Sequence, residues 1–150
     1  ADESVAAASF EAHATLVGVT EVDVATGNHT FKVDEPEALG GTDLAANPVQ
    51  LVLASLGACQ AITYQVWAAK LGIEIEGVEA RVEGDIDLRG FFGIDESIRP
   101  GFTRIRLFVT LRGPESEERF QELVDAVNMH CPVLDIVANP VPIDREVKFA

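Results

Sequence analysis

The stretch that decides the fold is LAANPVQLVLASLGACQAITYQVWAAKL, residues 44–71, in which Lys70 is the only charged side chain. Asn47 can cap a helix with its side-chain oxygen, and Pro48 has the fixed φ that suits a first helical turn. Gly72 can end that helix in a left-handed conformation. Glutamine, serine and threonine are spread along the stretch, and no basic cluster flanks it. The sequence therefore predicts a core helix, apolar on nearly every face, and no membrane association.

Alternating apolar and polar side chains predict strands on both sides of this helix. Gly27 and Asn28 supply a turn between the first two of these segments. The Phe-rich connection between the third and fourth segments is expected to be long and partly exposed, with its phenylalanines available to pack on a partner chain. The expected strands are 13–26, 29–33, 78–88, 102–111 and 143–149.

A second helix is expected from Ser116, where acidic residues gather at its positive end. Pro132 interrupts its apolar pattern, which indicates a kink or restart at Cys131. The resulting order, ββ-α-ββ-α-β, predicts an α+β fold with a mainly antiparallel sheet and two helices on one side. A length of 150 residues suits a single domain over residues 1–150. Two apolar helices over so few short strands favour a homodimer.

Charge and cysteine content limit the possible partners and compartment. A formal net charge of -14 disfavours binding to nucleic acid, which normally depends on clustered Lys and Arg. Two cysteines in a domain of this size argue against a disulfide-stapled secreted scaffold, so a reducing, cytoplasmic location is expected. The first ten residues show no targeting segment, although a chain that does not begin with Met leaves a removed leader open.

The two cysteines, Cys59 and Cys131, are the residues with candidate chemistry. Small residues precede Cys59, and these let another backbone or a ligand approach the helix closely. Backbone N–H groups at a helix start stabilise a thiolate, a condition that Cys131 meets if Pro132 opens a new helix. Free cysteines are also common as small core residues, so the residues alone leave both interpretations open. The histidines lack the convergent spacing of a zinc site, so neither a metal nor a cofactor is expected.

A resemblance to a known family adds to this reading. The motif NPVQL at 47–51 and ASLGAC at 54–59, together with His130-Cys131-Pro132 in a second helix, resembles the OsmC/Ohr family of thiol peroxidases. The expected order of strands and helices is similar as well, from the first hairpin to the last strand. The resemblance implies an intertwined homodimer with two long central helices and active sites at the subunit interface.

The same resemblance implies an antioxidant enzyme of the oxidative stress response. Cys59 matches the peroxidatic cysteine, which attacks an organic hydroperoxide and becomes a sulfenic acid. Cys131 matches the resolving cysteine, which forms a redox-active disulfide with Cys59. In this family a dithiol such as a lipoyl group reduces that disulfide.

Two departures from the family pattern suggest a divergent OsmC-like branch. In the organic hydroperoxide branch a glutamate follows the Asn-Pro pair, and an amino-terminal arginine joins it at the sulfur. Here Val49 stands at the glutamate position, and no arginine precedes Arg81. The alternative to a peroxidase is a weakly active or non-catalytic protein that binds a small hydrophobic ligand at the dimer interface.

Overall fold

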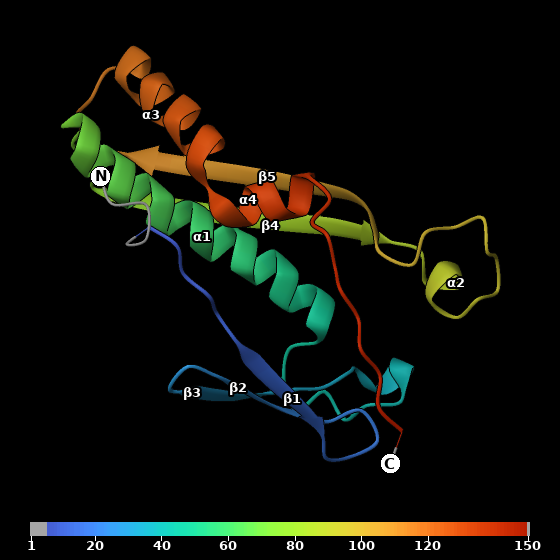
Figure 1. Ribbon diagram of the computed structural model, residues 1–150. Coiled ribbons are helices and arrows are strands. Elements are labelled where there is room, and N and C mark those ends of the chain that lie inside the picture. The colour runs from blue at the N-terminus through green and yellow to red at the C-terminus, as the bar shows by residue number, and fades with distance from the viewer. Residues whose placement is uncertain (1–5, 150) are drawn as a thin grey trace. The chain divides into compact units, whose positions relative to one another are not determined.

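The computed structural model describes residues 6–149 and has an α+β architecture (Figure 1). The chain divides into two compact units, and the boundary between Val52 and Leu53 lies inside the long helix α1 (Pro48–Leu71). The expected α+β class is confirmed, but the strands form two separate antiparallel sheets in place of one. One sheet belongs to each unit.

The first unit contains a three-stranded antiparallel sheet of β1 (Ala12–Leu16), β2 (Val22–Thr26) and β3 (His29–Val33), paired in chain order. The turn expected at Gly27 is present, with a positive φ of 55° that favours glycine. The single strand expected over 13–26 is wrong, because the chain reverses at residues 17–21 and pairs β1 with β2. Val17 and Gly18 both donate backbone hydrogen bonds to the Glu21 carbonyl. The sequence does not reveal this turn, because valines alternate through it as they would in a continuous strand.

The segment between β3 and α1 is organised around a buried carboxylate. Asp34 is 1% exposed, and its oxygens accept hydrogen bonds from Thr20 Oγ1 (2.6 Å), Thr42 Oγ1 (2.7 Å), Thr42 N (2.9 Å) and Leu44 N (3.2 Å). These bonds, with that from Thr20 foremost, hold the pKa of Asp34 well below its ordinary range. One turn of 3-10 helix, Glu37–Leu39, completes this segment.

We expect Asp34 to make the stability of the protein fall in acid. A carboxylate with a lowered folded pKa stabilises the fold above its unfolded pKa of about 3.9, and this contribution is lost as pH falls toward the folded pKa. Asp34→Asn should lower the thermal midpoint by several degrees at pH 7 and by clearly less at pH 3. Thermal unfolding at both pH values measures this, with the exposed Asp43→Asn in the same segment as control. An equal loss at both pH values would contradict the assignment.

Helix α1 begins and ends where the sequence predicts. Asn47 N donates to Gln50 Oε1 (3.0 Å), and Gln50 N donates to Asn47 Oδ1 (2.9 Å), a reciprocal capping box. At the other end Gly72 has a φ of 64°, and Ile73 N donates to the Ala68 carbonyl. α1 is long and apolar enough to span a bilayer by length and composition alone, and the core helix of a globular domain has the same profile.

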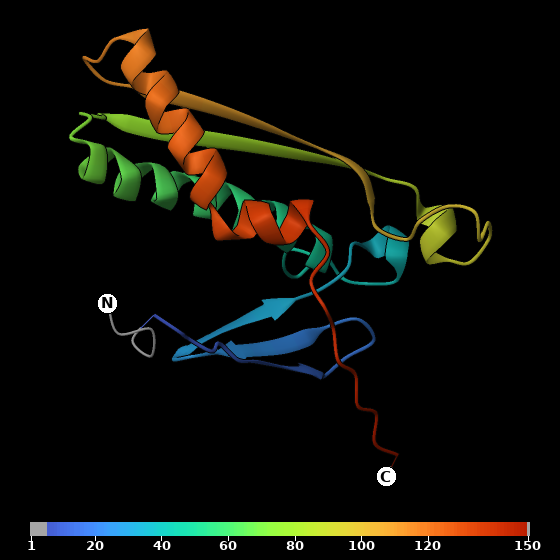
Figure 2. The ribbon, with the colours of Figure 1, turned by 45° about the horizontal axis from the view of Figure 1, so that its top comes forward.

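The second unit pairs a long two-stranded ribbon with the remaining helices (Figure 2). Its strands are antiparallel and are joined by a connection that contains one short helix. Asp87 caps this short helix by accepting a hydrogen bond from Arg89 N. The sequence pattern predicts no helix in this connection. The elements are β4 (Gly77–Ile86), α2 (Leu88–Phe91), β5 (Phe102–Arg112), α3 (Glu117–His130) and α4 (Pro132–Ala138).

The core of the second unit lies where α1 meets α3 and the ribbon. Tyr64 and Ala68 of α1 pack with Leu123 and Val127 of α3, and all four are at most 2% exposed. Gly57 brings α1 close to β4, because a Cβ there would meet Val82 Cγ2 at 3.3 Å. Partly buried residues of both strands cover this cluster, namely Val78, Val109 and Leu111. The helices therefore pack on one face of the ribbon.

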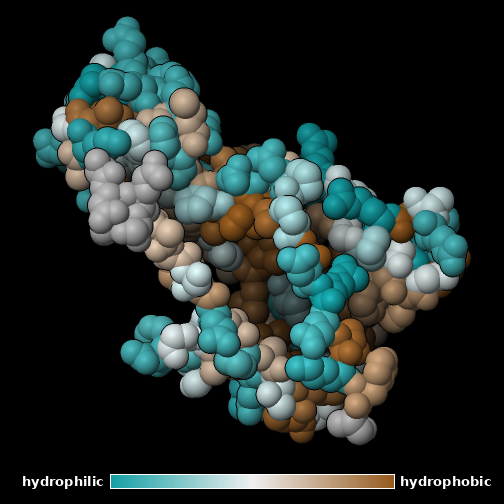
Figure 3. All heavy atoms as spheres, viewed as in Figure 1, coloured by the Kyte–Doolittle hydropathy of each residue, from teal (hydrophilic) through white to brown (hydrophobic). Residues whose placement is uncertain are grey.

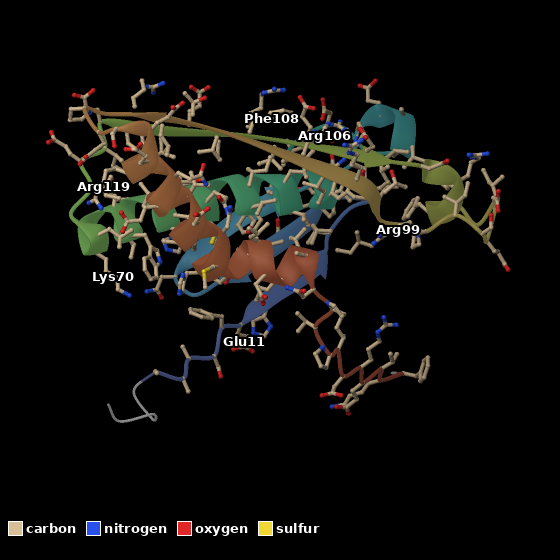
Figure 4. The ribbon with its side chains drawn as sticks, turned by 90° about the horizontal axis from the view of Figure 1, so that it is seen from above. Glu11, Lys70, Arg99, Arg106, Phe108 and Arg119 are labelled. Carbon is tan, nitrogen blue, oxygen red and sulfur yellow. The ribbon has the colours of Figure 1, made fainter. Side chains whose placement is uncertain are left out.

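A polar clamp fixes the end of α1 to the start of α3. Arg119 donates to the Leu71 carbonyl (3.0 Å), and Figure 4 shows Arg119 near this end of α1. Glu74 N donates to Glu115 Oε1 (2.8 Å), and Ser116 caps α3 by accepting from Arg119 N. The helix start expected at Ser116 is confirmed.

The last strand expected, over 143–149, is wrong. The structure describes these residues without assigning them to a strand. Alternation is present, but its apolar members are exposed: Ile143 by 73%, Val147 by 72% and Phe149 by 96%. A strand needs the hydrogen-bonding edge of another strand, and the described part of this chain pairs none with it.

Candidate functional site

The two cysteines lie side by side although they are 72 positions apart in the chain. Cys59 is on α1, and Cys131 lies at the junction between α3 and α4. Their Sγ atoms are 3.5 Å apart, and both are free thiols. A disulfide bond measures about 2.05 Å, so a short movement of either side chain suffices to form one. The structure therefore presents a dithiol within reach of oxidation.

The two sulfurs differ in access. Cys131 is 2% exposed and belongs to the buried core cluster, whereas Cys59 is partly exposed and packs at the margin of that cluster. A reagent in solution therefore reaches the sulfur of Cys59 more easily than the sulfur of Cys131. The pair is thus asymmetric, with one accessible sulfur and one sheltered sulfur.

Core packing positions Cys131. Leu123, Val127 and Cys131 follow one another at four-residue intervals and are all buried, so they form one stripe along α3 and its C-cap. Cys131 N donates to the Val127 carbonyl as the last bond of α3, and Pro132 then begins α4. The restart expected from the sequence at Cys131 is therefore confirmed.

A neighbouring hydroxyl and a close helix contact position Cys59. Thr63, one turn later on α1, donates its hydroxyl to the Cys59 carbonyl (2.7 Å) and places Oγ1 4.0 Å from the Cys59 sulfur. Gly57, two residues earlier, presses against β4. The small residues before Cys59 thus serve the approach of a strand, one of the two possibilities that the sequence suggested.

An aromatic stack flanks the dithiol. The Trp67 ring of α1 lies over the His130 ring with centroids 4.0 Å apart, and Lys70 Nζ lies 3.9 Å from the Trp67 centroid. His130 Nδ1 is 2.7 Å from the Ala126 carbonyl, so Nδ1 carries the proton in that bond. Figure 4 labels Lys70 at the same end of α1 as Arg119. Because His130 precedes Cys131, this stack ties the junction of α3 and α4 to α1.

Gln60 and Tyr64, two of the buried side chains of α1 that carry polar groups, are not among the site residues expected from the sequence. Gln60 is fully buried, and Tyr64, one turn later, is 2% exposed. Burial raises the pKa of Tyr64, and the nearby Cys131 charge raises it further. The four-residue spacing of Gln60 and Tyr64 places them on one face of α1, and this was the available signal. Spacing alone does not show whether that face is buried or exposed.

An apolar surface borders the accessible sulfur. Ile62 and Val66 follow Cys59 at helical spacings of three and seven residues, and they are 64% and 57% exposed. Ile136 of α4 is 56% exposed. Figure 3 shows apolar residues gathered on the face that carries α1 and α4. The surroundings of Cys59 suit a partner or substrate with a hydrophobic part.

Charged groups and metal ligands are scarce around the sulfurs. Among residues 6–149 no Lys, Arg, Asp or Glu side chain forms a hydrogen bond with either sulfur, and no group of three or more potential metal ligands occurs. Val49, at the position of the family glutamate, is a partly buried residue in the first turn of α1. In the described part of the chain, the two sulfurs therefore have no direct hydrogen bond from a charged side chain.

Fold and site together define an α+β protein with a dithiol held between two helices. A family model described as OsmC-like protein matches residues 41–146. The chain belongs to this family. No curated protein matches the chain in sequence.

Solved structures show the same fold. An OsmC-like protein from Mycoplasma pneumoniae superposes with a TM-score of 0.75 at 21% identity, covering 87% of this chain and 88% of that one. An organic hydroperoxide resistance protein OsmC from Legionella pneumophila gives 0.67 at 23% identity, with 87% and 89% covered. The organic hydroperoxide resistance protein OhrB of Bacillus subtilis gives 0.57 at 26% identity, with 85% and 88% covered.

Proposed function

We propose that the protein is a thiol peroxidase that reduces organic hydroperoxides through Cys59 and Cys131. The observation that carries this proposal is the 3.5 Å separation of two free thiols that are 72 positions apart. Core packing alone does not require two sulfurs to meet, whereas disulfide chemistry does. Membership of the OsmC-like family supports the proposal, as do fold neighbours that are named organic hydroperoxide resistance proteins.

The two sulfurs take different roles because they differ in access. The partly exposed Cys59, as thiolate, attacks the terminal oxygen of the hydroperoxide, forming an S–O bond while the O–O bond breaks. The alkoxide leaves with the electron pair and takes up a proton to become an alcohol. The buried Cys131 thiol then attacks the Cys59 sulfenic acid, releasing water and forming the disulfide. Two thiols and one hydroperoxide thus yield one disulfide, one alcohol and one water.

The proposed substrate and partners follow from the exposed apolar residues. Ile62 and Val66 beside Cys59 favour a hydroperoxide with an organic tail over hydrogen peroxide. The same exposed face of α1 suits a second copy of the chain, so we propose a homodimer. A lipoyl-type dithiol would reduce the disulfide by thiol exchange, as expected in the cytoplasm.

A second candidate function rests on a specific observation. Val49 stands where the family glutamate is expected, and the described part of the chain places no charged side chain on either sulfur. A protein with this fold but slow thiol chemistry would bind a small hydrophobic ligand without reducing it.

Intact mass spectrometry of the reduced protein distinguishes the two candidates. After one equivalent of cumene hydroperoxide, a peroxidase should lose two hydrogens within seconds to minutes and show a Cys59–Cys131 link in a peptide digest. Hydrogen peroxide at the same concentration should react more slowly. Persistent free thiols would reject the peroxidase and favour the binding protein.

A further inference from the structure

Cys131 lies on a stretch of chain with little buried support of its own. It is the C-cap of α3 and the N-cap of α4, with an extended backbone (φ -80°, ψ 110°) and no side-chain cap on α4. In the described residues 128–149, Cys131 is the only buried side chain. Segments with few buried contacts open more readily than the core. Any further contact between this junction and α1 therefore affects where the Cys131 sulfur lies.

The stack of Trp67 and His130 is such a contact. The two ring centroids are 4.0 Å apart with an interplanar angle of 31°. Trp67 lies on α1, the helix of Cys59, and His130 directly precedes Cys131. Side chains on a helix lean toward its N-terminus, so the indole covers the turn of α1 on the Cys59 side of Trp67. The same two segments therefore meet twice, at the rings and at the sulfurs, whose Sγ atoms are 3.5 Å apart.

Each ring is also held by its own helix. Lys70 Nζ lies 3.9 Å from the Trp67 ring centroid, a cation–π contact within α1. His130 Nδ1 lies 2.7 Å from the Ala126 carbonyl, a hydrogen bond within α3. A ring that is restrained on its own helix loses little further freedom when it stacks. The stack therefore acts as a stiff link between α1 and the end of α3.

We propose that His130 is a positioning residue that stacks on Trp67 and so keeps the Cys131 sulfur within reach of Cys59 for disulfide formation. The inference rests on the proposed peroxidase function. In this step the Cys131 sulfur attacks the sulfur of the Cys59 sulfenic acid, the S–S bond forms and the S–O bond breaks. The departing hydroxide takes the proton that the Cys131 thiol loses and becomes water.

The geometry makes this second step more sensitive to the stack than the first. The two sulfurs must close from 3.5 Å to about 2.05 Å, and a displacement of reacting groups by about 1 Å can slow a reaction by about 100-fold. The first step, the attack of Cys59 on the hydroperoxide, uses neither Cys131 nor the link at His130. Loss of the stack should therefore separate the two rates.

His130→Ala tests this separation by intact mass spectrometry and dimedone labelling after one equivalent of cumene hydroperoxide. Oxidation of Cys59 should stay within a factor of about three of the wild-type rate, because this step precedes the use of Cys131. Conversion of the sulfenic acid to the disulfide should slow by about 10- to 100-fold. Asn128→Ala is the matched control, since Asn128 is exposed in the same last turn of α3. The control should match the wild type in both steps.

Rescue by conservative variants separates the ring stack from the other contact of His130. His130→Phe keeps a ring for Trp67 but loses the hydrogen bond to Ala126, and it should form the disulfide at nearly the wild-type rate. His130→Asn keeps an N–H donor but loses the ring, and it should be as slow as His130→Ala. Trp67→Leu should slow the same step, and adding His130→Ala to it should slow it no further, because both changes remove one interaction.

Diamide provides an arm of the experiment that does not depend on peroxide chemistry. Diamide adds to the Cys59 thiolate through an S–N bond, and Cys131 then displaces the hydrazine as the S–S bond forms and the S–N bond breaks. His130→Ala should slow this displacement as it slows the step after the sulfenic acid. A wild type that forms the disulfide with diamide but not with cumene hydroperoxide would overturn the peroxidase and leave the positioning role to be decided by the diamide rates.

Three outcomes would overturn the positioning role itself. The first is a wild-type rate of disulfide formation in His130→Ala with both oxidants. The second is a fast His130→Asn beside a slow His130→Phe, since the hydrogen bond and not the stack would then matter. The third is an equal slowing of both steps in His130→Ala together with a lower urea midpoint, which would make His130 a general support of the fold.

Discussion

Cys59→Ser is expected to abolish disulfide formation and hydroperoxide consumption, lowering the rate by at least on the order of 10³-fold. A neutral hydroxyl is a poor nucleophile toward a peroxide, and the buried Cys131 cannot take over because it is only 2% exposed. Stopped-flow or discontinuous assays of cumene hydroperoxide consumption, with an excess of dihydrolipoamide as reductant, measure the loss. Cys59→Ala should behave in the same way, which separates the missing thiol from the added hydroxyl.

Met129→Leu is the control for this experiment. Met129 carries the only other sulfur in the chain, is 79% exposed and is open to oxidation by peroxide. The control should consume hydroperoxide at the wild-type rate. Peroxide consumption by Cys59→Ser at a rate near that of the wild type would remove Cys59 from the mechanism, whatever the behaviour of the control.

Cys131→Ser is expected to separate the two chemical steps. The first attack of Cys59 should proceed within a factor of about three of the wild-type rate, because Cys131 acts only after the sulfenic acid has formed. Turnover with a dithiol should fall by about tenfold or more, because the mutant cannot form the intramolecular disulfide and must rely on an intermolecular reaction. Intact mass should rise by one oxygen atom in place of losing two hydrogens, and a sulfenic-acid probe such as dimedone should label Cys59.

Excess hydroperoxide sharpens this prediction. In the mutant the unresolved sulfenic acid should proceed to sulfinic acid and inactivate the protein irreversibly, whereas the wild type should recover with dithiothreitol. Cys131→Ser also replaces a buried core residue, so circular dichroism of the mutant is the companion measurement. A folded mutant that still loses two hydrogens on oxidation would show that Cys131 is not the resolving cysteine.

Local signals in the sequence predicted most of the elements of the second unit. Asn47-Pro48 and Gly72 mark the two ends of α1, and Ser116 and Pro132 mark the starts of α3 and α4. Each of these residues starts or ends a helix through its own backbone or side-chain geometry, so its effect can be predicted from the local sequence alone. Strand pairing is not local, and this explains the wrong expectations of a single sheet and of strands over 13–26 and 143–149. The turn at Gly18 interrupts an alternating pattern that the sequence shows as continuous, and segment 143–149 alternates without a partner edge.

The candidate site was predictable only in part, for the same reason. Cys59 and Cys131 stand out in the sequence, and the structure brings them together. Trp67 fits the apolar pattern of a core helix, and Gln60 and Thr63 are polar residues within that pattern. None of them stands out as a site residue, because α1 is apolar on nearly every side and its pattern does not reveal which face meets α3. That information depends on the crossing of two helices distant in sequence, which a single chain does not encode in any local motif.

The separation of 72 positions between the two sulfurs links oxidation to conformational entropy. A covalent bond between them closes a long loop in the unfolded ensemble, and the chain-entropy model values this restriction at about 4 kcal/mol. The oxidised protein would then resist heat and proteases better than the reduced one. By the same thermodynamic cycle, any change that weakens the native contact between α1 and α3 makes the disulfide easier to reduce. The free energy of unfolding and the reduction potential of the disulfide are therefore coupled in this chain.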